Sequence, residues 1–80
     1  MFSEIEKAAL QVGFKQTKRA LNENRAGKVF VTEDSDANMV SAVLELCREQ
    51  NVPVEKVPTM RELGNMCGID VGASCAVLVK

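Results

Sequence analysis

The 80-residue sequence contains no histidine, only two prolines and only three cysteines. Histidine is the usual general base near neutral pH, so its absence removes the most common acid–base catalyst. The sequence also lacks the GxSxG nucleophile elbow, the Walker phosphate loop and the GxGxxG dinucleotide fingerprint. These absences indicate a protein that is not an enzyme and that uses no cofactor.

The cysteines Cys47, Cys67 and Cys75 are separated by 20 and 8 positions and form no CxxC pair. With no histidine to complete the set, a zinc site would lack ligands. All three cysteines lie in apolar stretches, so we interpret them as buried free thiols. A redox or thiol-dependent function is the alternative interpretation.

Glu33, Asp34 and Asp36 are the densest group of carboxylates in the chain. Such a group either holds a divalent cation or caps a following helix. The helix cap is the favoured interpretation, because no further ligands follow at the spacing of a calcium loop. The sequence therefore predicts no metal site.

No apolar run approaches the roughly 18–20 residues that a membrane span requires. The first six residues, Met-Phe-Ser-Glu-Ile-Glu, are acidic and lack the basic and apolar regions of a signal peptide. We therefore expect a cytoplasmic protein with no membrane contact. The length fits one domain over residues 1–80, expected to be a monomer.

Charge is unevenly distributed along the chain. The net charge of −1, taken alone, argues against a nucleic-acid partner. Residues 13–28, however, carry five cationic side chains against one glutamate, whereas residues 33–62 carry seven acidic against three basic ones. A basic patch on a neutral protein can meet a phosphate backbone. Two ordinary solvated faces are the alternative explanation.

Helical and strand patterns alternate along the chain. Ser3 to Glu6 resembles a capping box and predicts a first helix that ends at Gly13. A second helix is expected over residues 15–23, with Asn24 as its left-handed cap. A third is expected after Asp36 and a fourth after Thr59, the latter stopped by Gly68.

Three strands are predicted between these helices. Residues 28–32 contain an apolar Val-Phe-Val run, which is typical of a strand covered on both faces. Pro53 places the strand around residues 52–57 at an edge of the sheet, while residues 74–79 suit a central strand. The order α-α-β-α-β-α-β, with a further short strand possible near Gly13, predicts a three-layer α/β/α sandwich around a small mixed sheet of about four strands.

The segment GFKQTKR, residues 13–19, carries the clearest functional signal. It places several cations at the start of a helix, where unpaired N–H groups and the helix dipole favour phosphate. Gln16 has a donor and an acceptor and can read the edge of a base. An anion or nucleic-acid site and a solvated amphipathic helix are both consistent with this pattern.

Four ordered motifs resemble the kink-turn-binding ribosomal-protein family, and its short bacterial members most of all. They are GFKQTKRAL from Gly13, VTEDSD from Val31, VPTMRELGNMCG from Val57 and IDVGAS from Ile69. Together they cover essentially the whole chain. The resemblance implies a ribosome-associated RNA-binding protein whose partner is a kink-turn in ribosomal RNA or in an mRNA leader.

The resemblance also implies roles for individual residues. The helix after Gly13 would enter the major groove of the kink-turn, with Lys15 and Gln16 facing the guanines of sheared G·A pairs. The loop at residues 69–73 would cover a base extruded from the bulge, which is how bulged RNA gives specificity. The implied RNA-binding residues are Gly13, Phe14, Lys15, Gln16, Lys18, Arg19, Lys28, Ile69, Asp70, Val71, Gly72 and Ala73.

This reading requires the segment after Gly13 and the turn after Gly68 to meet in space. Two departures from the family pattern concern charge. Lys15-Gln16 replaces the Asn-Glu of many archaeal members, and Asn22-Glu23-Asn24 replaces a basic-Gly turn, which removes positive charge near the RNA. A protein-interaction adaptor on the same fold is the rival function, because fold alone does not determine function.

Overall fold

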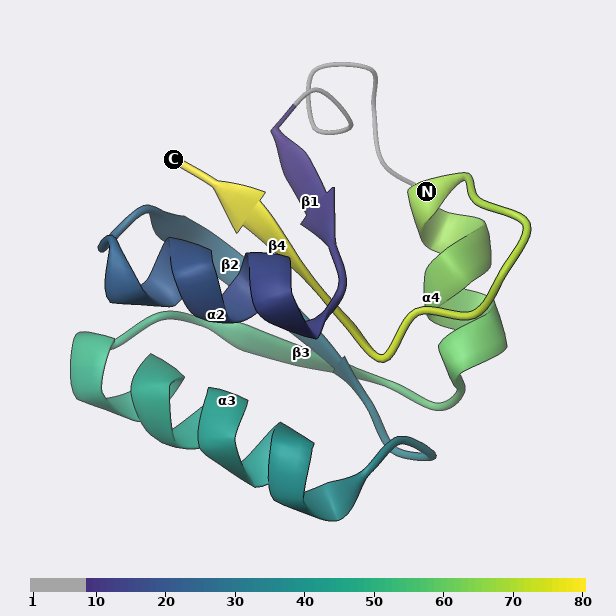
Figure 1. Ribbon diagram of the computed structural model, residues 1–80, viewed down its shortest axis with the longest axis horizontal. Helices are drawn as coiled ribbons and strands as arrows, with labels where there is room; N and C mark the ends of the chain where they lie inside the picture. The colour runs from purple at the N-terminus through teal and green to yellow at the C-terminus, as the bar shows by residue number, and fades with distance from the viewer. Residues whose placement is uncertain (1–8) are drawn as a thin grey trace.

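The computed structural model describes residues 9–80, which form a four-stranded mixed sheet with helices on both faces (Figure 1). The strands are β1 (Leu10–Val12), β2 (Ala26–Thr32), β3 (Val54–Val57) and β4 (Cys75–Val79). The helices are α2 (Phe14–Asn22), α3 (Ala37–Gln50) and α4 (Met60–Cys67). The predicted α/β/α sandwich is therefore confirmed, while the predicted capping box at Ser3 and Glu6 lies outside the described residues.

The strands lie in the order β1-β4-β2-β3. Strand β4 is antiparallel to both of its neighbours, whereas β2 and β3 are parallel and joined through α3. The predicted central position of the last strand and the edge position of the strand after Pro53 are both confirmed. The proline lies immediately before β3, and its carbonyl accepts a hydrogen bond from the Val29 N–H at 2.9 Å.

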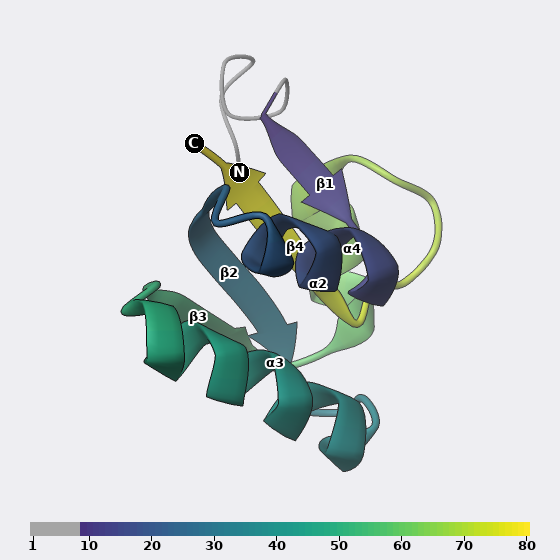
Figure 2. The ribbon, with the colours of Figure 1, turned by 60° about the vertical axis from the view of Figure 1, so that its left-hand side comes forward.

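Alternation of side chains along the strands divides the interior into two clusters. Val29 and Val31 of β2 point to the face covered by α2 and α3, while Phe30 between them points to the face covered by α4. Figure 2 shows α2 and α3 on one side of the sheet and α4 on the other. The Val-Phe-Val run is apolar throughout because both faces of β2 are covered.

The ends of the helices follow the predicted capping residues. The Asp36 carboxylate accepts from the backbone N–H groups of Asn38 and Met39, and the Thr59 hydroxyl accepts from that of Glu62. Asn24 has a positive φ, and Gly68 is the left-handed cap of α4. These caps satisfy helix-end groups that would otherwise need water.

The prediction of a helix that ends at Gly13 is wrong for residues 10–12. Leu10, Gln11 and Val12 form β1 and pair with Leu78, Val77 and Ala76 of β4. Leu10 and Val12 both pack on the α4 side of the sheet, which is a spacing of two, typical of a strand. The pairing partner is more than 60 residues away in the sequence, so local periodicity carries no sign of it.

Within residues 9–80 no helix is both long and apolar enough to span a bilayer.

Leu63 of α4 has no exposed surface and fills the centre of the cluster under that helix. We expect Leu63→Ala to lower the free energy of unfolding by about 2–5 kcal/mol, because it removes buried methyl groups and leaves a cavity. Val71→Ala is the matched control, since that side chain is 70% exposed; it should change stability by less than about 0.5 kcal/mol. Urea denaturation of the two variants measures both values, and equal midpoints would contradict the assigned core.

Candidate nucleic-acid interface

Helix α2 begins at a glycine turn that is attached to the start of β4. The Gly13 N–H donates to the Cys75 carbonyl at 2.8 Å, and the Gly13 carbonyl accepts from the Thr17 hydroxyl at 2.8 Å. Gly13 has φ 110°, a conformation that L side chains rarely adopt. The turn therefore needs glycine for its backbone conformation, and the buried Thr17 holds the first helical turn against the sheet.

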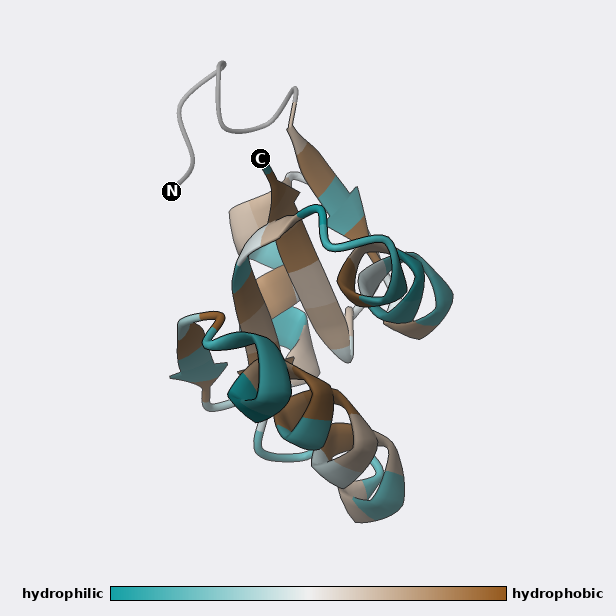
Figure 3. Cartoon of the chain, turned by 90° about the vertical axis from the view of Figure 1, so that its left-hand side faces the viewer, coloured by the Kyte–Doolittle hydropathy of each residue, from teal (hydrophilic) through white to brown (hydrophobic). Residues whose placement is uncertain are grey.

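Helix α2 is amphipathic across its whole length. Ala20 and Leu21 are buried against the sheet, while Lys15, Lys18 and Arg19 are exposed. Figure 3 shows mainly hydrophilic residues on this helix and hydrophobic residues along the strands. The Lys18 ammonium lies 5.9 Å from the centre of the Phe14 ring, within the range of a cation–π contact. The predicted cations are therefore presented to solvent on one helix.

Within the described residues, neither the N-cap nor the first turn of α2 supplies a negative charge. Its N-cap, Gly13, has no side chain to accept the first backbone N–H groups, and the first turn contains no acidic residue. Unpaired N–H groups and the positive end of the helix dipole attract anions. Because the exposed side chains of Lys15 and Gln16 lie in this same turn, the site combines backbone donors with side-chain donors.

The loop after Gly68 is fixed to α4 at both of its ends. The Ile69 N–H donates to the Gly64 carbonyl at 3.1 Å, and the Ala73 N–H donates to the Met60 carbonyl at 3.0 Å. The Val71 side chain is nevertheless 70% exposed. The loop therefore exposes the apolar Val71 side chain to solvent, where it adds little to the stability of the fold. Exposed apolar side chains of this kind are common on binding surfaces.

The two predicted segments lie at the same end of the sheet. Gly13 is hydrogen-bonded to Cys75, which follows Ala73 by two positions, so the start of α2 and the end of the loop are neighbours. Figures 1 and 2 both show the loop after α4 passing the amino end of α2. The structure brings together a cationic helix start and an exposed apolar loop.

Lys28 is not part of this cluster. It lies on β2 with its ammonium 2.9 Å from the Glu55 carboxylate and 5.2 Å from the centre of the Phe30 ring. Phe30 packs in the cluster under α4, whereas α2 covers the opposite face. Lys28 therefore lies apart from the α2 surface.

Sequence reasoning did not foresee the ion pairs at the end of α2. Glu23 accepts from Arg19 Nε at 3.4 Å and from Arg25 Nη1 at 3.2 Å. The hydrogen bond from Arg25, followed by the bond and charge of Arg19, lowers the pKa of the Glu23 carboxyl despite some opposing desolvation. The spacing of four between Arg19 and Glu23 on one helix was the available signal.

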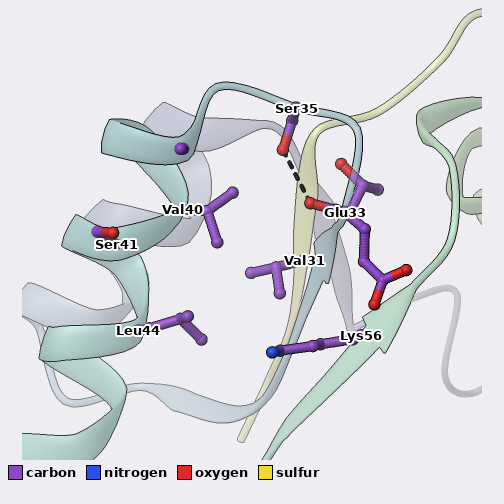
Figure 4. A pocket seen from close by; sticks show the side chains of 9 residues that line it. Val31, Glu33, Ser35, Val40, Ser41, Leu44 and Lys56 are labelled. Carbon is purple, nitrogen blue, oxygen red and sulfur yellow. Dashed lines mark hydrogen bonds between the residues drawn. The ribbon is translucent and has the colours of Figure 1, made fainter.

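A hollow of about 330 Å³ opens between α3 and the carboxyl ends of β2 and β3 (Figure 4). Val31, Val40 and Leu44 form its apolar side, while Glu33 and Lys56 lie at its polar side. Its volume is at the lower end of the range for small-ligand pockets. The adjoining loop is fastened to α4, because the Asp34 carboxylate accepts from the Met60 N–H at 2.9 Å.

The remaining groups offer little chemistry of their own. All three cysteines are buried and unpaired. Burial raises the pKa of the Cys47 and Cys67 thiols, which disfavours the reactive thiolate. No three of the Asp, Glu and Cys side chains in residues 9–80 converge as a metal site. Asp34 and Asp36 instead accept from backbone N–H groups at the starts of α4 and α3.

The mixed sheet, the helices on both faces and the cationic helix beside an apolar loop define a class of small α/β/α proteins with a surface suited to anions. The chain belongs to the ribosomal protein L7Ae/L30e/S12e/Gadd45 family, whose sequence profile matches residues 4–80. This establishes the family that the four motifs resemble.

Relatives in bacteria extend over most of the chain. An RNA-binding protein of Geobacillus sp. (strain WCH70) is 46% identical over 69 residues, covering 86% of this chain and 84% of the relative. The RNA-binding protein YbxF of Geobacillus stearothermophilus is 40% identical over 76 residues, covering 95% and 93%.

Solved structures share the fold at lower identity. The Giardia lamblia 15.5kD RNA binding protein superposes with a TM-score of 0.85 at 23% identity, and the match covers 91% of this chain. The chain spans 62% of the length of that protein. A protein from Bacillus halodurans superposes with a TM-score of 0.82 at 19% identity.

Gly64 lets the loop approach α4 closely. A Cβ atom at this position would collide with the Val71 carbonyl group, which is backbone and cannot rotate away. We expect Gly64→Ala to lower the free energy of unfolding by about 1–3 kcal/mol, despite the better helix propensity of alanine. Urea denaturation measures this change, with Asn65→Ala as the control variant because Asn65 is an exposed neighbour on α4. A midpoint at or above that of the control would show that the loop does not depend on this contact.

Proposed function

We propose that this protein binds RNA at kink-turns, with α2 and the loop at residues 69–73 as the two halves of its interface. The observation that supports the proposal is the hydrogen bond from Gly13 to Cys75, because it brings the start of α2 and the end of the loop to the same end of the sheet. Membership of the family and the RNA-binding names of its bacterial relatives support it. We further propose that it acts as a monomeric single domain in a ribosome-associated role.

The first turn of α2 is proposed to read the guanines of the sheared G·A pairs. Lys15 and Gln16 are exposed there, beside the uncapped amino end of the helix. A lysine donates to guanine acceptors, and a glutamine amide can both donate and accept at a base edge. Thr17 and Ala20 are buried and fix the helix, so Lys15 and Gln16 project from a rigid backbone.

The remaining cations of α2 are proposed to contact phosphate. Lys18 and Arg19 are exposed on the helix, and within residues 9–80 the Arg19 guanidinium contacts one carboxylate, that of Glu23, at 3.4 Å. Phosphate contacts supply affinity and make it salt-dependent, whereas base contacts supply specificity. The local concentration of cations on α2 thus compensates for the net charge of −1 of the whole chain.

The loop is proposed to receive a base extruded from the bulge. Val71 offers an exposed apolar surface, while Ile69 is half-buried in the cluster under α4 and supports the loop from below. Apolar side chains give an unstacked base a surface to rest on. The hollow beside α3 (Figure 4) lies near the carboxyl end of β2, the same end of the sheet, and adds apolar surface there.

A gel-shift comparison of a kink-turn RNA with a plain duplex RNA of equal length tests this function. We expect clear preference for the kink-turn, because only the bent and bulged RNA engages α2 and the loop together. The affinity should fall as salt rises, with a slope set by a few phosphates. Equal affinity for the two RNAs would contradict kink-turn recognition, and no binding to either would favour the protein-adaptor function.

Two substitutions on α2 test the proposed residue roles. We expect Gln16→Ala and Arg19→Ala each to weaken kink-turn binding by about 1–3 kcal/mol, through loss of a base contact and of a phosphate contact respectively. Arg48→Ala is the matched control, because Arg48 is an exposed arginine on α3. Fluorescence anisotropy measures the affinities. Losses of affinity no larger than that of Arg48→Ala would show that α2 is not part of the interface.

A further inference from the structure

A second, polar hollow lies along α2 on the side of the edge strand β1. Its volume is about 250 Å³, and its lining residues are Gln11, Gln16, Arg19, Ala20, Glu23 and Arg25. The α2 members repeat at intervals of three and four, so they form one stripe of the helix. Gln11 belongs to the hollow because its neighbours Leu10 and Val12 point to the opposite face of the sheet.

Four of the side chains around this hollow, those of Gln11, Gln16, Arg19 and Arg25, carry N–H donors. The amides of Gln11 and Gln16 make no hydrogen bond to any residue in the part of the chain that the structure describes. The two arginines make their ion pairs with a single acceptor, Glu23, at 3.4 and 3.2 Å. Among residues 9–80, two guanidinium groups therefore share one carboxylate, and their other N–H donors have no carboxylate acceptor there.

The Glu23 carboxylate accepts from both guanidinium groups. Guanidinium groups bind carboxylate and phosphate with the same fork of N–H donors, so the two anions are interchangeable ligands. Arg19 and Arg25 side chains are 74% and 55% exposed, and that of Glu23 is 44% exposed. An ion pair in contact with solvent costs little to exchange, because water already screens it.

We propose that the hollow between α2 and β1 is a phosphate subsite, and that Glu23 holds its two arginines until a backbone phosphate displaces the carboxylate. The proposal rests on the RNA-binding function proposed above and extends the interface to Gln11 and Arg25. Arg19 and Glu23 line both this hollow and the neighbouring surface of α2 around Phe14, Lys15 and Lys18, so an RNA strand that follows the helix reaches the hollow. The ligand is a phosphodiester group, with no preference for a base.

Glu23→Gln is the direct test, because it keeps the shape of the side chain and removes the competing charge. We expect this variant to bind a kink-turn RNA about threefold to tenfold more tightly than wild type at 100 mM salt, with a salt slope steeper by about one. The gain should appear on duplex RNA as well, since phosphate contacts carry no sequence information. Fluorescence anisotropy over a series of salt concentrations measures both quantities.

Two further variants separate the subsite from general charge effects. Glu45→Gln changes the net charge equally, and Glu45 makes no ion pair among the described residues; it should leave the affinity nearly unchanged. Adding Arg25→Gln to Glu23→Gln should abolish the gain. A gain from Glu45→Gln as large as that from Glu23→Gln, or a gain that survives loss of Arg25, would overturn the subsite.

The same data distinguish this subsite from the proposed function. If wild type prefers the kink-turn but Glu23→Gln binds no more tightly, the subsite is wrong and the function stands. If wild type binds both RNAs equally and Glu23→Gln still gains through Arg25, the subsite stands without kink-turn recognition. Thermal unfolding of each variant checks that the fold is retained.

Discussion

The hydrogen bond between the Gly13 N–H and the Cys75 carbonyl is the constraint on which the proposed RNA interface depends. It extends the pairing of β1 with β4 by one more contact and turns the chain directly into α2. The helix start is consequently positioned by the centre of the sheet rather than by a free loop. A binding surface built on such rigid elements loses little conformational entropy when a partner arrives.

The loop at residues 69–73, the other half of the proposed interface, is positioned by close backbone packing. Gly64 brings the Val71 carbonyl against α4, while Met60 and Gly64 accept hydrogen bonds from the two ends of the loop. The Val71 side chain is then directed into solvent by a backbone that has little freedom to move. The loop backbone is held by α4, and the Val71 side chain can therefore stay exposed and accessible to a partner.

Sequence patterns predicted the elements whose signals are local. Asp36 and Thr59 cap the expected helices, Pro53 precedes an edge strand and the final apolar run is central in the sheet. For residues 10–12 the sequence favoured a helix and left a short strand near Gly13 only as an alternative, because the strand's partner lies at the other end of the chain. The separation of Lys28 from α2 and the sharing of Glu23 by two arginines likewise depend on tertiary placement, which spacing in the sequence does not encode.

Charge in this protein is organised locally, and the net value of −1 describes neither surface well. The first turn of α2 has a cation and no acidic residue of its own, so it attracts anions over a short range. The carboxyl end has two arginines already engaged by Glu23, so attraction there is weaker until an anion arrives in the right position. Because the two ends of α2 attract anions to different degrees, the helix favours an anionic partner that contacts both ends at once. Uniformly basic helices lack this bias, because every phosphate is attracted to them equally.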